Sequence, residues 1–209
     1  MLNSGLQKAD PGRIQKGMEM LNRNTNRVST FVKEFLSFSK GQEIETELAD
    51  PIEIAKEVVN TYSVKINQLG FQLKTSFQEN ISPAPMDAEG IHECLSNLLG
   101  NAIDACRISE NGDDLQILLR VSEKNNTIIF EVSDNGCGMD YEVKKKVFTT
   151  FFTTKGLGGT GLGLLTTKKI IHQHGGQVEF ESVLDQGTRF QISLPRERLP
   201  KLSEQPTES

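Results

Sequence analysis

Five glycines lie within the eight residues from Gly156 to Gly163, inside the stretch Thr153–Leu164. Glycine leaves φ almost unrestricted and adds no side chain, so successive backbone N–H groups in such a stretch can converge on an anion. After Gly161 the apolar residues recur at helical spacing, and the N-terminus of a helix also favours negative charge. Lys155 adds a positive charge just before the glycines. The stretch therefore predicts a phosphate-binding loop.

Two familiar phosphate loops fit these glycines poorly. The spacing matches G-x-G-x-x-G, but a dinucleotide-binding fold places that motif after its first strand, and here fewer than fifty residues follow Gly163. A nucleoside-triphosphatase P-loop ends in Gly-Lys-Ser/Thr, whereas this loop ends in Gly161-Leu162-Gly163. The glycines alone thus predict phosphate binding without predicting a fold.

Two carboxamides one helical turn apart form a second group with possible chemistry. The residues 88–108 predict a helix capped by Asp87, with Glu93, Asn97, Asn101 and Asp104 on its polar face. Amide oxygens on adjacent turns can hold a hard cation such as Mg²⁺, which prefers oxygen ligands and keeps several waters. The alternative is a solvated polar face without a ligand.

A single carboxylate forms the third group. The alternating residues 127–133 predict a strand that runs into Asp134-Asn135-Gly136-Cys137-Gly138. Asp134 can accept a hydrogen bond from an exocyclic amine such as that of adenine, and the two glycines let the backbone turn closely around a ligand. The alternative is an Asx-type turn that closes the strand.

The elements that must position these groups follow from the rest of the pattern. The sequence predicts helices over 51–70, 88–108, 141–147 and from Gly161 to about His174. It predicts strands over 42–49 and 71–77, a turn-rich connection over 79–85, and hairpins formed by 115–123 with 127–133 and by 177–182 with 188–194. Beyond Pro195 the chain is rich in charge, Pro and Ser, and we expect disorder.

A long helix from Pro11 to about Ser39, capped by Asp10 and ended by Gly41, is expected at the start of the chain. Its heptad-like apolar seam contains Ile14, Met18, Leu21, Val28, Val32, Phe35 and Phe38. Such a helix would be roughly 43 Å long, more than a compact domain usually covers. The seam predicts a dimerising helical bundle; the alternative is a helix folded onto its own domain.

Composition narrows the class of protein. The net charge of −5 over 209 residues argues against a general nucleic-acid binder, and no apolar run is long enough to span a bilayer. The cysteines, Cys94, Cys106 and Cys137, show neither metal-site spacing nor a disulfide framework. We therefore expect a cytoplasmic protein with no nucleic-acid partner and no membrane contact by this chain.

The motifs taken in order resemble the ATP-binding domain of bacterial sensor histidine kinases, over roughly residues 43–195. The Phe-Phe-Thr-Thr-Lys form before the glycines resembles the kinases related to nitrogen-regulation sensors. The motifs are Asn97-x-x-x-Asn101-Ala102, Asp134-x-Gly136-x-Gly138, Phe148 to Lys155, Gly159-Thr160-Gly161-Leu162-Gly163-Leu164, His174-Gly175-Gly176 and Gly187-Thr188-x-Phe190.

The resemblance implies a Bergerat-type α+β fold, a two-layer α/β sandwich with helices on one face of a mixed sheet. It implies that Asn97 and Asn101 lie near Mg²⁺ and the phosphates of ATP, that Asp134 reads the adenine amine, and that Thr188 supports the adenine side. The ATP lid and phosphate loop would contain Lys155, Gly156, Gly158, Gly159, Thr160, Gly161, Leu162 and Gly163. The reaction would be in-line transfer of the γ-phosphoryl group to a histidine nitrogen, which depends mostly on positioning and charge neutralisation.

One position separates kinase from hydrolase. Gyrase-type and mismatch-repair ATPases carry a Glu one turn before their metal-binding Asn, as general base for water, and this chain has Asn97 there. An amide does not usefully accept a proton, so the residue favours transfer to a protein acceptor. Glu93, one turn further back, is a candidate to reach the nucleophile, and Lys155 a candidate phosphate contact.

The resemblance also predicts the domain organisation. Residues 1–42 resemble the second helix of the dimerisation and phosphoacceptor bundle, 43–196 the catalytic domain, and 197–209 a disordered tail. The acceptor histidine belongs to the first helix of that bundle, so it would lie on a helix absent from this chain. His92-Glu93 mimics the acceptor dipeptide, but it falls inside the predicted helix of Asn97 and is not expected to be the acceptor.

The implied partners are a second protomer, the phosphoacceptor helix and a response regulator. The alternatives are a nucleotide-independent dimerisation or interaction fragment, a stand-alone ATPase, and a serine kinase of the anti-sigma type.

Overall fold

The computed structural model describes residues 10–39, 44–109, 112, 114–149, 152–153 and 160–202. A five-stranded mixed sheet is its centre, with the strand order β2-β4-β5-β7-β6. The strands are β2 (Gln72–Phe77), β4 (Gln116–Lys124), β5 (Thr127–Asp134), β6 (Gln177–Val183) and β7 (Gly187–Pro195). β2 pairs with β4 in parallel, and the other neighbours are antiparallel.

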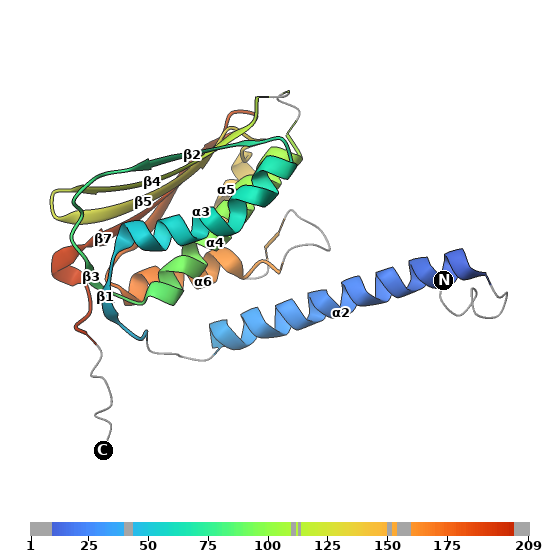
Figure 1. The fold of residues 1–209 in the computed structure, drawn as a ribbon, viewed down its shortest axis with the longest axis horizontal. Helices are drawn as coiled ribbons and strands as arrows, with labels where there is room; N and C mark the ends of the chain where they lie inside the picture. Colours follow the sequence, from blue (N-terminus) through green and yellow to red (C-terminus); the bar gives the residue numbers. More distant parts are fainter. Residues whose placement is uncertain are drawn as a thin grey trace, which may run out of the picture.

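Helices α3 (Pro51–Gln68), α4 (Ala88–Arg107) and α6 (Gly163–Gln173) lie on one side of this sheet (Figure 1). Two of them begin at aspartate caps: Asp87, the predicted cap of α4, accepts from the Gly90 N–H at 2.8 Å, and Asp50 accepts from the Ile52 N–H at 2.8 Å. The predicted two-layer α/β sandwich with helices on one face of a mixed sheet is therefore confirmed.

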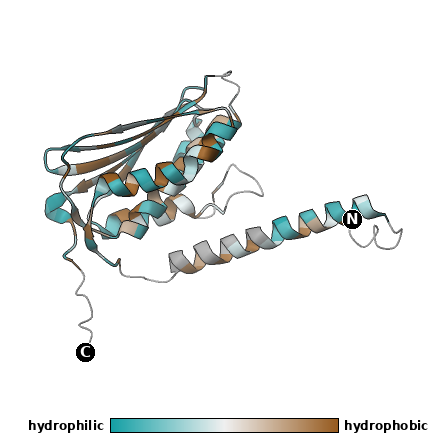
Figure 2. Cartoon of the chain, viewed as in Figure 1, coloured by the Kyte–Doolittle hydropathy of each residue, from teal (hydrophilic) through white to brown (hydrophobic). Residues whose placement is uncertain are grey.

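The core lies between these helices and the inner face of the sheet. Alternate residues of the central strands turn inward and are fully buried, as Ile117 and Leu119 of β4 and Ile128 and Phe130 of β5 are. Hydrophobic and hydrophilic residues alternate along these helices (Figure 2), as expected where only one face of a helix is buried. The polar face of α4 consequently points away from the core, and that face carries the predicted site residues.

Two short strands correct the expected connections. β1 (Glu47–Ala49) is shorter than the predicted strand 42–49, and β3 (Ala84–Met86) lies partly within the predicted turn-rich connection. They pair with each other, Leu48 opposite Pro85, in a separate two-stranded sheet. The sequence did not predict β3 because proline has no N–H to donate to the hydrogen bonds of a sheet and is normally found only on edge strands.

The start of the predicted disordered tail is also corrected. Arg196–Arg198 form a short 3₁₀ helix, and Leu199 packs against the core. The Arg196 guanidinium donates to both carboxylate oxygens of Glu123, at 2.8 and 2.9 Å, and to the Ser82 carbonyl at 2.6 Å. These contacts with residues distant in the sequence order a segment whose composition alone indicates disorder; residues 203–209 lie outside the described residues.

The long helix α2 (Pro11–Ser39) has the predicted bounds, and Asp10 accepts from the Arg13 N–H at its start. It extends away from the sandwich (Figure 1) and contacts α6. Most described residues of its apolar seam, among them Leu21, Val28 and Val32, are exposed. The helix is confirmed, whereas dimerisation through it stays a prediction.

No helix within the described residues is long and apolar enough to cross a membrane.

Candidate functional site

Helix α4 places the two carboxamides on its half-buried polar face. Its opposite face is buried through residues such as Leu95, Leu98 and Leu99, so rotation of the helix is fixed by packing. Asn97 Nδ2 donates to the Gly163 carbonyl at 3.3 Å, which ties this face to the first residue of α6. Asn101 lies one turn along the same face. Asn97 therefore meets the start of α6, whereas the roles of both carboxamides at a phosphate chain stay predictions.

The start of α6 has backbone features that could bind an anion. Gly161 has φ +70°, and the Leu162 N–H bonds to Thr160 Oγ1 at 3.3 Å. Leu162 is fully buried and anchors the end of the glycine-rich stretch, while no side chain caps the helix that follows. The first N–H groups of an uncapped helix lack intrahelical partners and carry the positive end of the helix dipole. Gly163 begins this helix, so its first turn offers donors beside Asn97.

Four of the predicted loop residues, Lys155, Gly156, Gly158 and Gly159, lie outside the described residues. The proposed phosphate contact of Lys155 consequently stays a prediction. The described part of the loop begins again at Thr160.

Asp134 stands at the end of β5, where the predicted strand ends. Its Oδ1 accepts from the Gly136 N–H at 2.9 Å, the Asx-type turn that the sequence left as an alternative. Burial raises the pKa of this carboxyl to about 6, and the backbone N–H groups of Gly136 and Thr188 oppose that rise. A half-buried carboxylate needs donors for its remaining lone pairs, which an exocyclic amine can provide.

Three glycines beside Asp134 allow backbone to approach backbone. A Cβ on Gly136 would lie 2.6 Å from the Ala105 carbonyl carbon, and one on Gly138 (φ +61°) would lie 2.0 Å from the Val183 carbonyl oxygen. A Cβ on Gly187 (φ +108°) would lie 1.9 Å from the Asp134 carbonyl oxygen. The loop after β5 is therefore held between α4 and the β6–β7 turn by contacts that only glycine permits.

Thr188 is buried opposite Asp134 in the β5–β7 ladder. Ser182 Oγ donates its single proton to the Gly187 carbonyl at 3.1 Å and lies 3.0 Å from Thr188 Oγ1. The Thr188 hydroxyl is accordingly the donor to Ser182, and it retains only acceptor capacity toward other groups. Ser182 was not predicted as a site residue; its place in a hairpin two residues before the turn gives no local signal for this contact.

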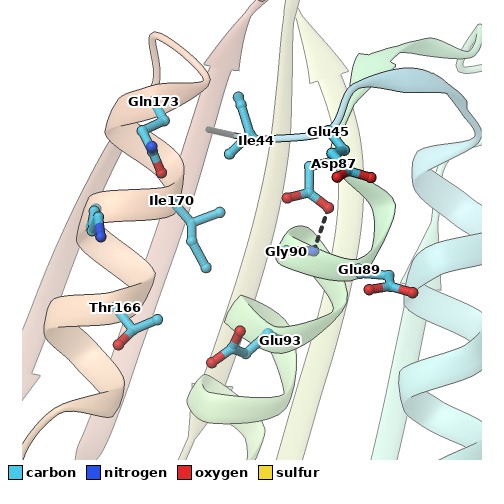
Figure 3. A pocket seen from close by; sticks show the side chains of 10 residues that line it. Ile44, Glu45, Asp87, Glu89, Gly90, Glu93, Thr166, Ile170 and Gln173 are labelled. Carbon is cyan, nitrogen blue, oxygen red and sulfur yellow. Dashed lines mark hydrogen bonds between the residues drawn. The ribbon is translucent and has the colours of Figure 1, made fainter. Parts of the chain in front are cut away.

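Glu93 lies apart from Asp134, in the wall of a pocket of about 360 Å³ between α4 and α6 (Figure 3). Asp87, Glu89 and Glu93 line its α4 side, and Thr166, Lys169, Ile170 and Gln173 line its α6 side. Glu93 is half-buried one turn before Asn97. The structure thus places Glu93 near the carboxamides without assigning it a role.

The donor set can be tested for Mg²⁺. The described residues contain no group of three His, Cys, Asp or Glu side chains that could hold a metal ion. A cation here would be held by amide oxygens, by phosphate oxygens of a bound ligand and by water, a set that suits Mg²⁺ because it dehydrates reluctantly. Asn97 and Asn101 fit that chemistry.

Comparison with known proteins decides the family. Residues 86–198 match the model of the family described as histidine kinase-, DNA gyrase B- and HSP90-like ATPase, which is more than half of the chain. The chain belongs to this family. Within it, the protein is an ATP-binding domain of the sensor histidine kinase type.

The relatives agree with that assignment. The sensor kinase CckA of Brucella abortus is 31% identical over 84% of this chain, and the chain spans only 20% of the length of CckA. The nucleotide-free catalytic domain of the histidine kinase ThkA is 28% identical, with a TM-score of 0.64 over 74% of this chain and 99% of that domain. ThkA in complex with the response regulator TrrA matches with a TM-score of 0.73, 27% identity, and coverage of 90% of this chain and 53% of ThkA.

Proposed function

We propose that this domain binds Mg-ATP and transfers its γ-phosphoryl group to a histidine on a separate helix, for relay to a response regulator. The observation that carries the proposal is that α4 contacts two candidate ligand groups: the loop of the half-buried Asp134 carboxylate, through the Cys137 N–H to the Ala105 carbonyl at 3.2 Å, and the uncapped N-terminus of α6, through Asn97 Nδ2 to the Gly163 carbonyl at 3.3 Å. The first suits a purine amine and the second a phosphate chain.

We call Asp134, Gly136, Gly138, Gly187 and Thr188 the purine end. Asp134 would accept from the adenine amine, and the two glycines of the loop between β5 and helix α5 (Tyr141–Lys146) would let the backbone follow the ring. Thr188 would support this end through Ser182. The cost of burying Asp134 would then be offset by the hydrogen bond from the ligand.

We call Asn97, Asn101 and Thr160–Gly163 the phosphate end. The N–H groups of the first turn of α6 would bind phosphate oxygens, while the oxygens of Asn97 and Asn101 would face the Mg²⁺ ion. Mg²⁺, when bound, neutralises phosphate charge. The lone pair of the acceptor imidazole forms the P–N bond as the bond from the γ-phosphorus to the bridging oxygen breaks, and ADP leaves with that oxygen.

Two of the chain's three histidines, His92 and His174, are poorly placed as acceptors. His174 is fully buried with both ring nitrogens in hydrogen bonds, and His92 is half-buried on α4, the helix of the carboxamides. We therefore place the acceptor histidine on another helix. The exposed apolar seam of α2 would be covered by a second protomer. The ThkA complex with TrrA supports a response regulator as the downstream partner.

The test has two steps. Calorimetry should show ADP binding to the wild-type chain in the presence of Mg²⁺, and loss of binding in Asp134→Ala and Asn101→Ala. Asn60→Ala, an exposed asparagine on α3, is the matched control and should bind as the wild type does. A helical-bundle fragment that carries an acceptor histidine should then acquire acid-labile phosphohistidine from ATP.

Other outcomes would select the other functions. Acid-stable phosphoserine on a partner would indicate a serine kinase, and turnover of ATP without any acceptor would indicate an ATPase. Dimerisation without nucleotide binding in all variants would contradict the proposal and indicate an interaction fragment.

A further inference from the structure

Helices α4 and α6 are joined at the end farthest from the site by a buried histidine. His174, which ends α6, is fully buried, and its Nε2 accepts from the Asp87 N–H at 2.9 Å. Because Nε2 is the acceptor, the ring proton lies on Nδ1, which donates to the Ile170 carbonyl at 2.7 Å. Burial lowers the pKa of this imidazole, in keeping with the neutral tautomer.

The contact point is the N-terminus of α4. Asp87 caps this helix through the Gly90 N–H, so the N–H that His174 binds belongs to the capping residue itself. A Cβ on the buried Gly90 would lie 3.2 Å from Ile170 Cγ2, which shows how closely α6 approaches α4 here. Figure 3 shows Ile170 facing Asp87 and Gly90 across this narrow space.

The same two helices are joined again at the site. Asn97 Nδ2 bonds to the Gly163 carbonyl at 3.3 Å, and between the two ends Cys94 Sγ lies 3.8 Å from the Thr167 carbonyl. The eleven residues of α6 span roughly 16 Å, so His174 and the first turn of α6 stand at the two ends of one short, continuous helix. A displacement of its end at His174 can therefore shift the first turn of α6.

We propose that His174 is a positioning residue for phosphate binding: by holding the end of α6 against the cap of α4, it sets where the uncapped first turn of α6 stands relative to Asn97. The inference rests on the proposed binding of ATP. It assigns to His174 a role that acts on the phosphate end and leaves the purine end, which is built by β5, β7 and their turns, unaffected.

Two substitutions separate the hydrogen bonds of His174. In His174→Gln the amide oxygen takes the place of Nε2 and can still accept from the Asp87 N–H. In His174→Asn the amide nitrogen takes the place of Nδ1 and can still donate to Ile170, but Asp87 loses its acceptor. His172→Asn, on the exposed side of the same helix, is the matched control.

Dissociation constants of ADP and adenosine, measured by NMR titration with Mg²⁺ present, give the readout. We expect His174→Asn to weaken ADP about tenfold, to change adenosine by less than twofold, and to be rescued by His174→Gln. His172→Asn should leave both ligands unchanged. Equal weakening of ADP and adenosine, or equal effects of Gln and Asn, would overturn the inference, because a purely structural loss affects both ends.

The wild-type chain provides a second measurement that does not depend on a folded variant. Coupling is reciprocal, so ADP should increase the hydrogen-exchange protection of the Asp87 amide, whereas adenosine should not. Equal protection with and without ADP would overturn the role of His174 even though ADP binds. Failure of the wild type to bind either ligand would instead overturn the proposed function, and the inference with it.

Discussion

At the purine end the close contacts are made by backbone atoms, whereas at the phosphate end they are made by side chains. Gly138 and Gly187 pass so close to the β6–β7 turn and to β5 that a Cβ would meet carbonyl oxygens at 2.0 and 1.9 Å. The three atoms nearest to a Cβ added at Gly163 all belong to the Asn97 amide, at 3.3 to 3.7 Å.

The difference has a structural cause. The purine end lies where paired strands of one sheet end, so its geometry follows from backbone hydrogen bonds that no side chain can replace. The phosphate end lies where two helices meet, and their relative position depends on side-chain contacts such as those of Asn97 and His174. Substitutions should therefore damage the fold at the first end and adjust ligand affinity at the second.

The largest expected effect is that of Gly187→Ala. The new Cβ would meet the Asp134 carbonyl oxygen in a residue with φ +108°, and we expect a loss of roughly 3 kcal/mol or more in the free energy of unfolding. Gly70→Ala is the control: it has φ +79° with nothing within 4 Å, and should cost only about 1 kcal/mol. Urea denaturation measures both, and equal losses would contradict the claim that backbone contact shapes the purine end.

An intermediate effect is expected from pH. Because burial raises the pKa of Asp134 to about 6, the carboxyl gains a proton below that pH, and the neutral acid is a much weaker acceptor for the adenine amine than the carboxylate. Affinity for adenosine should fall about tenfold per pH unit below 6. Stability should move the other way: the raised pKa means that the folded state binds the proton more tightly, so this group makes the free domain more stable as pH falls from about 6 toward 3.8.

Adenosine is the ligand for this measurement because it carries no phosphate that titrates near pH 6. NMR titrations between pH 7.5 and 5 should show the fall in the wild type and a flat, weak affinity in Asp134→Asn. A flat profile in the wild type would show that Asp134 does not contact the purine.

The smallest expected effect is that of Gly163→Ala at the phosphate end. The Cβ would lie 3.3 Å from Asn97 Oδ1, and the asparagine side chain can shift by the few tenths of an ångström required. We expect the free energy of unfolding to change by less than about 0.5 kcal/mol, as for substitutions outside the core, while ADP affinity falls a few-fold.

Gly136→Ala is its counterpart at the purine end, where the Cβ would meet the Ala105 backbone at 2.6 Å. Gly136→Ala should therefore lower the free energy of unfolding by more than Gly163→Ala does. The comparison would fail if Gly163→Ala proved as destabilising as Gly136→Ala in the same denaturation series.

Much of the site could be predicted from the sequence because its residues lie on elements with local signals. Asn97 and Asn101 share a helical face through the 3.6-residue period, and Asp134 follows a strand with clear alternation. Ser182 and His174 were not predicted as site residues, because their partners, Thr188 and Asp87, are chosen by how hairpin and helices pack.

By itself, the sequence determined where most helices and strands run and which faces are apolar, because periodicity and capping depend on neighbours in the chain. It also determined the family through the order of its motifs. Only the tertiary structure decided that β2 lies parallel to β4, that β1 pairs with β3, and that Arg196 orders the segment after β7 by reaching Glu123. These contacts join residues far apart in the chain, so they depend on the packing of the whole domain and leave no local pattern.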